Sequence, residues 1–464
     1  MAKHVSAGPF AIDKSSFVDP NGYVFRAEQG LFRAIRPAVE GFYRELFDRG
    51  LIDRLIASGL LIETQPAHNV AAVPERMVLS HREIRPLTYC IEWASSMLRD
   101  AGRTTIDLAE ALAEENCTLQ DAYPWNVLFD GARPIHVDFT SIVRVDQRLI
   151  WPAYIQFQSF FLRPLYLAQM GRGEVARALL MNSVSGISLE TLLRHARLPA
   201  RLRHPSWDLS ATADRLIQKR PALKARIQEL SRKGSAHLTP ALRRRFFQGL
   251  RRELEGFEFR TAGEIWARYY REIPDWVDRE AKVAAVRAIL ERLAPVSVLD
   301  LGCNTGLFSV IAAEAGARVL AIDSSEACIE ALYREAHSRG LPITPVIGDV
   351  LTPSPAFGFM AEQFPSFIDR AKSDTVLCLG LMHHLHITGR QPIAAIARML
   401  ARLAERALVF EFVARDDANV ERIESNRVID YTLETVLAAL RAHFATVDVQ
   451  PSDRETRRLI VCRK

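Results

Sequence analysis

The sequence predicts an α/β protein in two parts, with an open, mostly parallel sheet in its C-terminal half. A short apolar run, Val296–Leu301, ends in a glycine-containing turn and is followed at once by an Ala-rich helical stretch. Further apolar runs alternate with helical stretches after it, which is typical of a parallel sheet. The length of 464 residues leaves room for two or three domains.

Composition places the chain among ordinary globular proteins. Hydrophobic residues make up 48% and charged residues 25%, and the net charge of +5 neither demands nor excludes nucleic acid. The six cysteines contain no CxxC pair, so we expect no metal site, no disulfide framework and a reducing cytoplasm. Met1–Phe17 lacks a secretion-signal pattern, and polar residues interrupt the most apolar stretch, Leu149–Met170, so we expect no membrane span.

The turn after the first predicted strand has the chemistry of a nucleotide site. It reads DLGCNTG from Asp300 to Gly306, and its glycines let the backbone approach a ligand at the start of a helix. The next strand, Arg318–Ile322, ends in Asp323, whose carboxylate can accept hydrogen bonds from both hydroxyls of a ribose.

The spacing within this turn argues against a dinucleotide. Gly302 and Gly306 are separated by three residues, and Asn304 stands where a dinucleotide site has its middle glycine. Asp300 would repel a pyrophosphate and can serve a cationic ligand instead. The alternative for both glycines is a turn without a ligand.

This stretch resembles motif I of class I S-adenosylmethionine-dependent methyltransferases, and the resemblance continues across Trp266–Lys464. It implies a Rossmann-like sheet of seven strands with S-adenosylmethionine over the carboxyl ends of the strands. Later strands are expected at Asp374–Leu381, Leu408–Val413, Val447–Val449 and Leu459–Cys462.

The resemblance assigns further site residues. Asp349, in Gly-Asp-Val, is similar to the third-strand acid that contacts adenine, although it can also be a turn former. His383 and His384 are similar to an xHHL segment after the fourth strand, where a neutral imidazole can act as general base on an acceptor hydroxyl. Tyr269 and Lys282, before motif I, can meet the cofactor's carboxylate. Packing alone is the alternative for the histidines and for the helix that carries Tyr269 and Lys282.

The N-terminal half contains a second pattern. Asp121 and Asn126 are followed by a strand pair and then by Asp138, in an arrangement similar to the catalytic and metal-binding loops of the protein-kinase-like fold. A hairpin over Tyr23–Ile35 and a helix over Val39–Ser58 fit the smaller lobe of that fold. An unrelated fold is the alternative.

This half departs from an active kinase. No lysine occurs between Lys14 and Lys219, so the strand-three lysine that grips the phosphates is missing. Arg33 or Arg36 can substitute only in part, because a planar guanidinium is not equivalent to an ammonium. We therefore expect a degenerate kinase-like domain.

The resulting division is a kinase-like domain at 1–197, an Arg-rich helical linker at 198–263 and a methyltransferase domain at 264–464. The Arg-rich stretch can bind an anionic surface, but we expect the solvated face of a helix and no nucleic acid. The expected activity is methyl transfer from S-adenosylmethionine, most simply to a hydroxyl of a small molecule, sugar or lipid-linked intermediate, since no NPPY-type segment follows the fourth strand. The alternatives are a bifunctional kinase–methyltransferase and a non-catalytic cofactor-binding scaffold.

Overall fold

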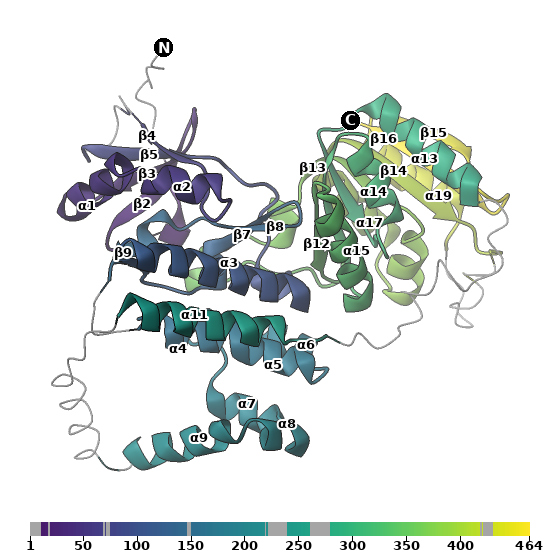
Figure 1. The fold of residues 1–464 in the computed structure, drawn as a ribbon. Helices are drawn as coiled ribbons and strands as arrows, with labels where there is room; N and C mark the ends of the chain where they lie inside the picture. The colour runs from purple at the N-terminus through teal and green to yellow at the C-terminus, as the bar shows by residue number, and fades with distance from the viewer. Residues whose placement is uncertain are drawn as a thin grey trace.

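The fold is that of a computed structural model, in which residues 11–16, 19–67, 70, 75–145, 150–218, 220, 239–259, 279–417, 420 and 430–464 are described. Figure 1 shows two bodies side by side, with the sheet of the C-terminal half to the right of the N-terminal elements. None of the helices within these ranges is both long enough and apolar enough to cross a bilayer.

The C-terminal half is built on the predicted sheet of seven strands, in the order β12-β11-β10-β13-β14-β16-β15. The first five strands of this order are parallel, and β16 runs antiparallel to both of its neighbours. The strand bounds confirm the expected strands, each to within a few residues: β10 Ser297–Leu301, β11 Arg318–Asp323, β12 Ile343–Ile347, β13 Ser373–Cys378, β14 Ala404–Val413, β15 Thr446–Pro451 and β16 Arg457–Arg463.

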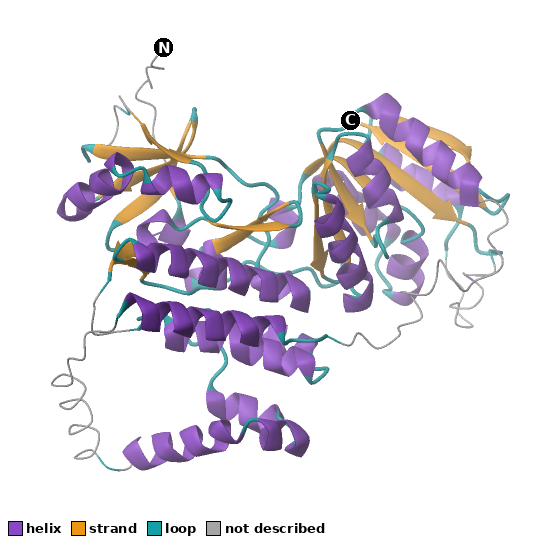
Figure 2. Ribbon diagram, viewed as in Figure 1, coloured by secondary structure: helices purple, strands orange, loops and turns teal. Residues whose placement is uncertain are grey.

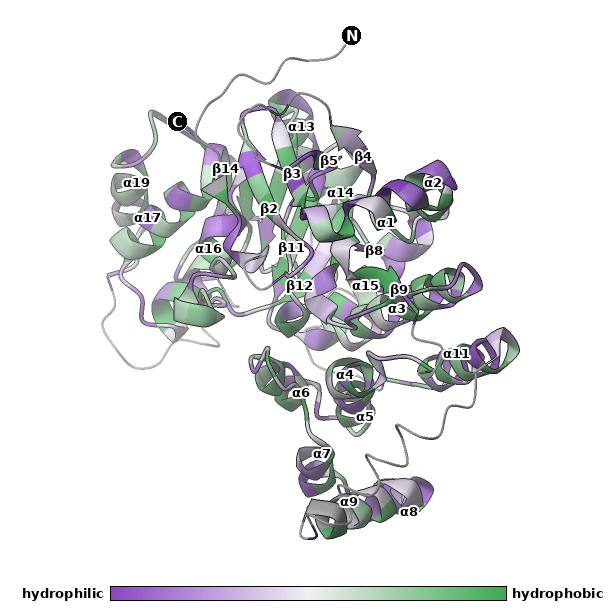
Figure 3. Ribbon diagram, turned by 90° about the vertical axis from the view of Figure 1, so that its left-hand side faces the viewer, coloured by the Kyte–Doolittle hydropathy of each residue, from purple (hydrophilic) through white to green (hydrophobic). Residues whose placement is uncertain are grey.

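Helices cover both faces of this sheet (Figure 2). Side chains alternate between the two faces along each strand, so Val298 joins the core under the first group of helices and Leu299 the core under the second. The strands are accordingly rich in hydrophobic residues, whereas most helices carry both kinds (Figure 3). The first group is α13 Arg279–Leu293, α14 Leu307–Glu314 and α15 Glu326–Arg339, and the second is α16 Phe367–Arg370, α17 Ile393–Leu403 and α19 Leu433–Arg441.

The N-terminal half starts with a five-stranded antiparallel sheet in the order β1-β2-β3-β5-β4. The predicted hairpin is present as β2 and β3, and the predicted helix is present as two helices between β3 and β4. The bounds are β1 Ala11–Ile12, β2 Gly22–Ala27, β3 Gly30–Ile35, α1 Pro37–Asp48, α2 Leu51–Ala57, β4 Thr64–Ala67 and β5 Met77–His81.

A long helix, α3 (Ser95–Glu114), follows, and two small antiparallel pairs flank the predicted loops. The strand pair expected after Asn126 is confirmed as β7 and β8. The bounds are β6 Cys117–Leu119, β7 Val127–Asp130, β8 Arg133–His136, β9 Ile142–Arg144, α4 Tyr154–Phe157, α5 Arg163–Gln169, α6 Gly173–Leu180, α7 Leu189–His195, α8 Leu198–Arg203, α9 Pro205–Gln218 and α11 Pro240–Glu255.

Helix α11, at the end of the stretch expected to be a linker, packs against α3 (Figure 1). Phe247, Leu250 and Leu254 recur at helical spacing and are buried in the same core as the apolar face of α3. Arg244 and Arg251 pair with acidic side chains of α3. These arginines therefore neutralise acidic side chains of the neighbouring helix. Helix α11 is thus part of the body formed by the N-terminal half.

The two halves meet through polar contacts between α3 and α15. Ser95 and Ser96 begin α3, whose N-cap residue makes no side-chain cap. Instead, Ser95 Oγ donates to Glu326 across 2.7 Å and the backbone N–H of Ser96 donates to Glu330 across 2.8 Å. Carboxylates at a helix N-terminus satisfy its free N–H groups and complement its dipole. One helix of the C-terminal half therefore caps a helix of the N-terminal half.

Candidate functional site

The glycine turn between β10 and α14 adopts the backbone geometry that its sequence requires. Gly302, Asn304 and Gly306 all have positive φ angles, of 69°, 52° and 88°. A Cβ at Gly306 would lie 2.2 Å from a Leu332 methyl carbon, so both conformation and packing select glycine there. The N–H groups of Gly302 and Cys303 donate to Ile322 on β11. The turn is thereby fixed to the end of the neighbouring strand.

Asp323 ends β11 beside this turn. One oxygen of its carboxylate accepts the backbone N–H of Asn304 across 2.8 Å, and the other accepts that of Ser325, also across 2.8 Å. The side chain is half-buried. The structure thus brings Asp323 and Asn304 together, at the carboxyl ends of β10 and β11.

Asp300 is held inside the turn. It is 3% exposed, and Ser309 on α14 donates its hydroxyl to the carboxylate across 2.6 Å. Burial raises the pKa of Asp300 to about 6, against the lowering effect of the Ser309 hydrogen bond. Sequence analysis did not predict the contact with Ser309. This serine lies close to Asp300 only because α14 folds back against the end of β10.

Asp349 lies after β12, at the same edge of the sheet. It is exposed, and its carboxylate accepts the backbone N–H of Leu351 across 2.8 Å, as in an Asx turn. A Cβ at Gly348 would lie 2.8 Å from an Ile322 side-chain carbon, which fits glycine at this close approach. The geometry therefore gives Asp349 a turn-forming contact and leaves its carboxylate at the surface.

Lys282 on α13 forms a buried ion pair. Its Nζ lies 2.6 Å from Oε2 of Glu411 on β14, and the two side chains are 6% and 0% exposed. Ser452 donates to Oε1 of Glu411 across 2.8 Å. Ser452 was missed in the sequence, although an acid inside the apolar run VFEFV was a signal that Glu411 has a buried partner. Tyr269 lies outside the described residues.

His383 and His384 follow β13 and lie next to each other, with ring centroids 4.3 Å apart. Burial lowers the pKa of His383 to about 3, and it also lowers the pKa of His384. Both imidazoles are therefore neutral at pH 7. Within the described residues, Nδ1 of His383 is buried and has no hydrogen-bond partner.

The N-terminal pattern is also brought together in space. Arg33 on β3 lies 2.9 Å from Asp19 and 3.1 Å from Asp138, and Thr140 bonds to the same groups. Burial raises the pKa of Asp121, and the negative charge of Asp138 adds to this effect. Sequence reasoning missed Asp19, which reaches the cluster from the segment before β2.

Asn126 is connected to this cluster by a backbone hydrogen bond. Its carbonyl accepts the N–H of Val137, the residue before Asp138, across 2.8 Å. Nowhere in the described residues are three or more His, Cys, Asp or Glu side chains grouped so as to hold a metal ion.

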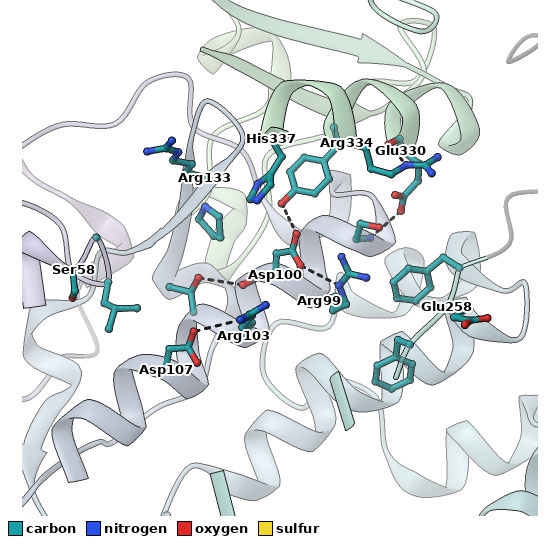
Figure 4. Close-up of a pocket in the computed structure, with 18 residues that line it drawn as sticks. Ser58, Arg99, Asp100, Arg103, Asp107, Arg133, Glu258, Glu330, Arg334 and His337 are labelled. Carbon is teal, nitrogen blue, oxygen red and sulfur yellow. Dashed lines mark hydrogen bonds and ion pairs between the residues drawn. The ribbon is translucent and has the colours of Figure 1, made fainter. Parts of the chain in front are cut away.

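A pocket of about 840 Å³ lies elsewhere, between α3 and α15 (Figure 4). None of the predicted site residues lines it. In its lining, Asp100 accepts both from Arg99 across 3.0 Å and from Tyr333 across 2.8 Å. This pocket belongs to the contact between the halves and lies apart from the glycine turn.

The sheet order and the turn at its centre define a class I methyltransferase fold in the C-terminal half. Residues 298–403 match the family described as methyltransferase domain. The protein is an S-adenosylmethionine-dependent methyltransferase, as the sequence predicted.

The chain is similar over its whole length to nodulation protein NoeA of Rhizobium meliloti (strain 1021), with 26% identity over 95% of this chain and 94% of that protein. Solved structures with a similar fold include two that cover less than half of the chain. Magnesium protoporphyrin IX methyltransferase (ChlM) from Synechocystis PCC 6803 with bound SAM has 20% identity and a TM-score of 0.31, over 44% of this chain and 92% of that one. WbdD has 18% identity and a TM-score of 0.30, over 44% of this chain and 43% of that one.

Proposed function

We propose that the protein transfers a methyl group from S-adenosylmethionine to a hydroxyl of a small molecule, a sugar or a lipid-linked intermediate. The observation that carries this proposal is the junction of Asp323 with the glycine turn through Asn304. It supports a ribose contact at Asp323, beside a turn that Gly302 and Gly306 hold in a backbone conformation with positive φ angles.

Other residues are proposed to complete the cofactor site. Lys282, and with it Tyr269, is assigned to the carboxylate, Asp349 to adenine, and Asp300 to the shape and charge of the turn. Asp300 acts through the turn, because its carboxylate is buried and bonded to Ser309. The residues present fit the cofactor, since they offer a carboxylate as ribose acceptor and a lysine ammonium for the amino-acid carboxylate at the carboxyl ends of the strands.

When bound, the cofactor supplies a methyl group already activated by its sulfonium. The protein has to hold the acceptor oxygen in line with that methyl, and positioning alone accounts for much of such an acceleration. A neutral imidazole of His383 or His384 can take the hydroxyl proton at the end of β13. Their lowered pKa values support the neutral form, although they also make each imidazole a weaker base.

The N-terminal half is proposed to be a kinase-like scaffold that positions the acceptor without transferring phosphate. Support comes from its strand order, from the helices between β3 and β4, and from the placement of Asp121, Asn126 and Asp138 around one cluster. In protein kinases the lysine of the third strand binds phosphates and the later aspartate binds magnesium. Here Arg33 is on the third strand and pairs with Asp138. The guanidinium and the carboxylate therefore bind each other in place of phosphate and magnesium.

Localisation in a reducing cytoplasm is part of the same proposal. All six cysteines are buried free thiols, which supports a compartment in which disulfides do not form.

The activity is tested with purified full-length protein and radiolabelled S-adenosylmethionine, incubated with fractionated cell extract. We expect label to appear as an alkali-stable methyl ether, in a product of low molecular mass or attached to a lipid. Calorimetric titration with S-adenosylhomocysteine checks cofactor binding independently. Cofactor binding without label in any fraction would support the non-catalytic scaffold, and label in protein or nucleic acid would contradict the proposed acceptor.

A further inference from the structure

The buried ion pair of Lys282 and Glu411 requires an explanation beyond stability. Taking two charges out of water costs several kcal/mol, and a buried pair is often no more stabilising than apolar side chains of the same volume. Buried ionisable groups are instead concentrated at functional sites. The position of this pair indicates which site it serves.

The pair lies at the end of β13, in the middle of the sheet. A Cβ at Gly380, two residues after β13, would lie 3.4 Å from Oε2 of Glu411. The next residue, Leu381, packs against Gly302 of the glycine turn, where a Cβ would lie 3.3 Å from it. The Lys282 ammonium is also 5.2 Å from the ring centroid of Phe308, in the first turn of α14. Lys282 therefore reaches the space beside the glycine turn.

Both oxygens of Glu411 are occupied, one by Lys282 and one by Ser452. A fully buried carboxylate with both oxygens bonded is held in one orientation. The lysine differs, because an ammonium has three N–H donors. Among the described residues Glu411 is the acceptor within hydrogen-bond distance of Lys282, so two donors are left for a ligand.

We propose that Ser452 and Glu411 are positioning residues that hold the Lys282 ammonium against the α-carboxylate of the cofactor. This inference rests on the proposed cofactor site. It adds a specificity: the protein distinguishes adenosyl ligands that carry the amino-acid carboxylate from those that lack it. Glu411 fixes where the ammonium lies, and Ser452 fixes the carboxylate of Glu411.

The test is calorimetric titration of the full-length protein with two ligands, S-adenosylhomocysteine, which has the carboxylate, and 5′-methylthioadenosine, which lacks the amino-acid part. Lys282→Met lowers affinity for the first by roughly tenfold to a hundredfold, the range for a lost hydrogen bond to a charged group. Glu411→Gln lowers it by about threefold or more, and Ser452→Ala acts in the same direction. Affinity for 5′-methylthioadenosine stays at the wild-type value in all three variants.

Two controls match these changes. Lys372→Met removes an exposed lysine before β13, and Glu405→Gln removes an exposed acid at the start of β14, the strand that carries Glu411. Each control variant binds S-adenosylhomocysteine and 5′-methylthioadenosine with the wild-type affinity. Where a single variant fails to fold because one buried charge is left alone, Lys282→Met with Glu411→Gln removes both charges, and Ser452→Ala keeps both. The double variant binds S-adenosylhomocysteine no more weakly than Lys282→Met, because the two residues act as one unit.

If the variants lose equal affinity for both ligands, the ion pair has a structural role only. If Lys282→Met keeps the wild-type affinity for S-adenosylhomocysteine, Lys282 does not contact the cofactor. Either result overturns this inference and leaves the proposed methyl transfer intact. Wild-type protein that binds neither ligand would overturn the proposed cofactor site itself.

Discussion

The guanidinium of Arg33 lies 3.1 Å from the carboxylate of Asp138, across the cluster that links β3 to the loop after β8. Asp19 and Thr140 hold the same guanidinium, and Arg33 is almost completely buried. In the proposed kinase-like scaffold, the aspartate assigned to magnesium is thus paired with the arginine assigned to phosphate.

We expect this pairing to prevent phosphate chemistry. Full-length protein incubated with radiolabelled ATP and magnesium should release no phosphate above a protein-free blank. The physical reason is that Arg33 and Asp138 would have to separate, which would take one of its two carboxylate partners from a buried guanidinium. Magnesium-dependent turnover that disappears in Asp138→Asn would contradict this expectation and support the bifunctional alternative.

Asp323→Ala should weaken binding of S-adenosylhomocysteine. The variant loses the proposed ribose contact and also the hydrogen bond that fixes Asn304. Hydrogen bonds to charged groups are worth about 1.5–3 kcal/mol, which corresponds to roughly tenfold to a hundredfold in affinity. Calorimetric titration measures this, and Asp448→Ala, at an exposed acid of β15, is the matched control. Wild-type affinity in folded Asp323→Ala would remove the residue from the site.

Replacing the general base with alanine should lower methyl transfer by about 10²–10⁴-fold, with little change in cofactor affinity. His383→Ala and His384→Ala are compared in the radiolabel assay, on the extract fraction that accepts the methyl group. Because burial lowers the pKa of His383 to about 3, the wild-type rate should hold well below pH 6.5 if this residue is the base. If both variants keep the wild-type rate, neither imidazole takes the proton.

Asp300→Asn should stabilise the protein at pH 8. The folded-state pKa of about 6 lies above the unfolded value, so the folded state binds the proton more tightly. The resulting stability is present below about pH 4 and is lost as pH rises through 6, because the carboxylate must then be ionised while buried. Removing the charge recovers about 3 kcal/mol at pH 8. Urea unfolding at pH 4 and pH 8 measures this, and an equal effect at both would contradict the assignment.

The contact between the halves contains a buried ion pair between Glu92 and Arg370, and its side chains are 2% and 3% exposed. Glu92→Gln should destabilise the protein by about 3–5 kcal/mol, since it leaves the guanidinium buried without its anion. Asp369→Asn, which breaks the exposed pair with Arg402, should cost less than about 1 kcal/mol. Denaturant midpoints compare the two. Equal midpoints would show that the buried pair contributes nothing beyond a surface pair.

The strands and the glycine turn of the C-terminal half were predictable because their signals are local. Apolar runs of five or six residues and the spacing of Gly302 and Gly306 need no distant partner to be recognised. The ion pairs were not predictable, because Lys282 and Glu411 are far apart in sequence and meet only once the sheet has formed. Arg33 was suggested as a substitute for lysine, but its pairing with Asp138 depends on the packing of the lobe.

The packing of α11 on α3 determines how the chain can be shortened. Gly102 on α3 leaves room for Leu254, which would be 3.5 Å from a Cβ there. A fragment ended at residue 197 would keep α3 but lose Phe247, Leu250 and Leu254, which cover it. The uncovered strip would be apolar and would favour self-association. An N-terminal fragment intended for expression should therefore extend to Phe259, so that α11 is present to cover the apolar face of α3.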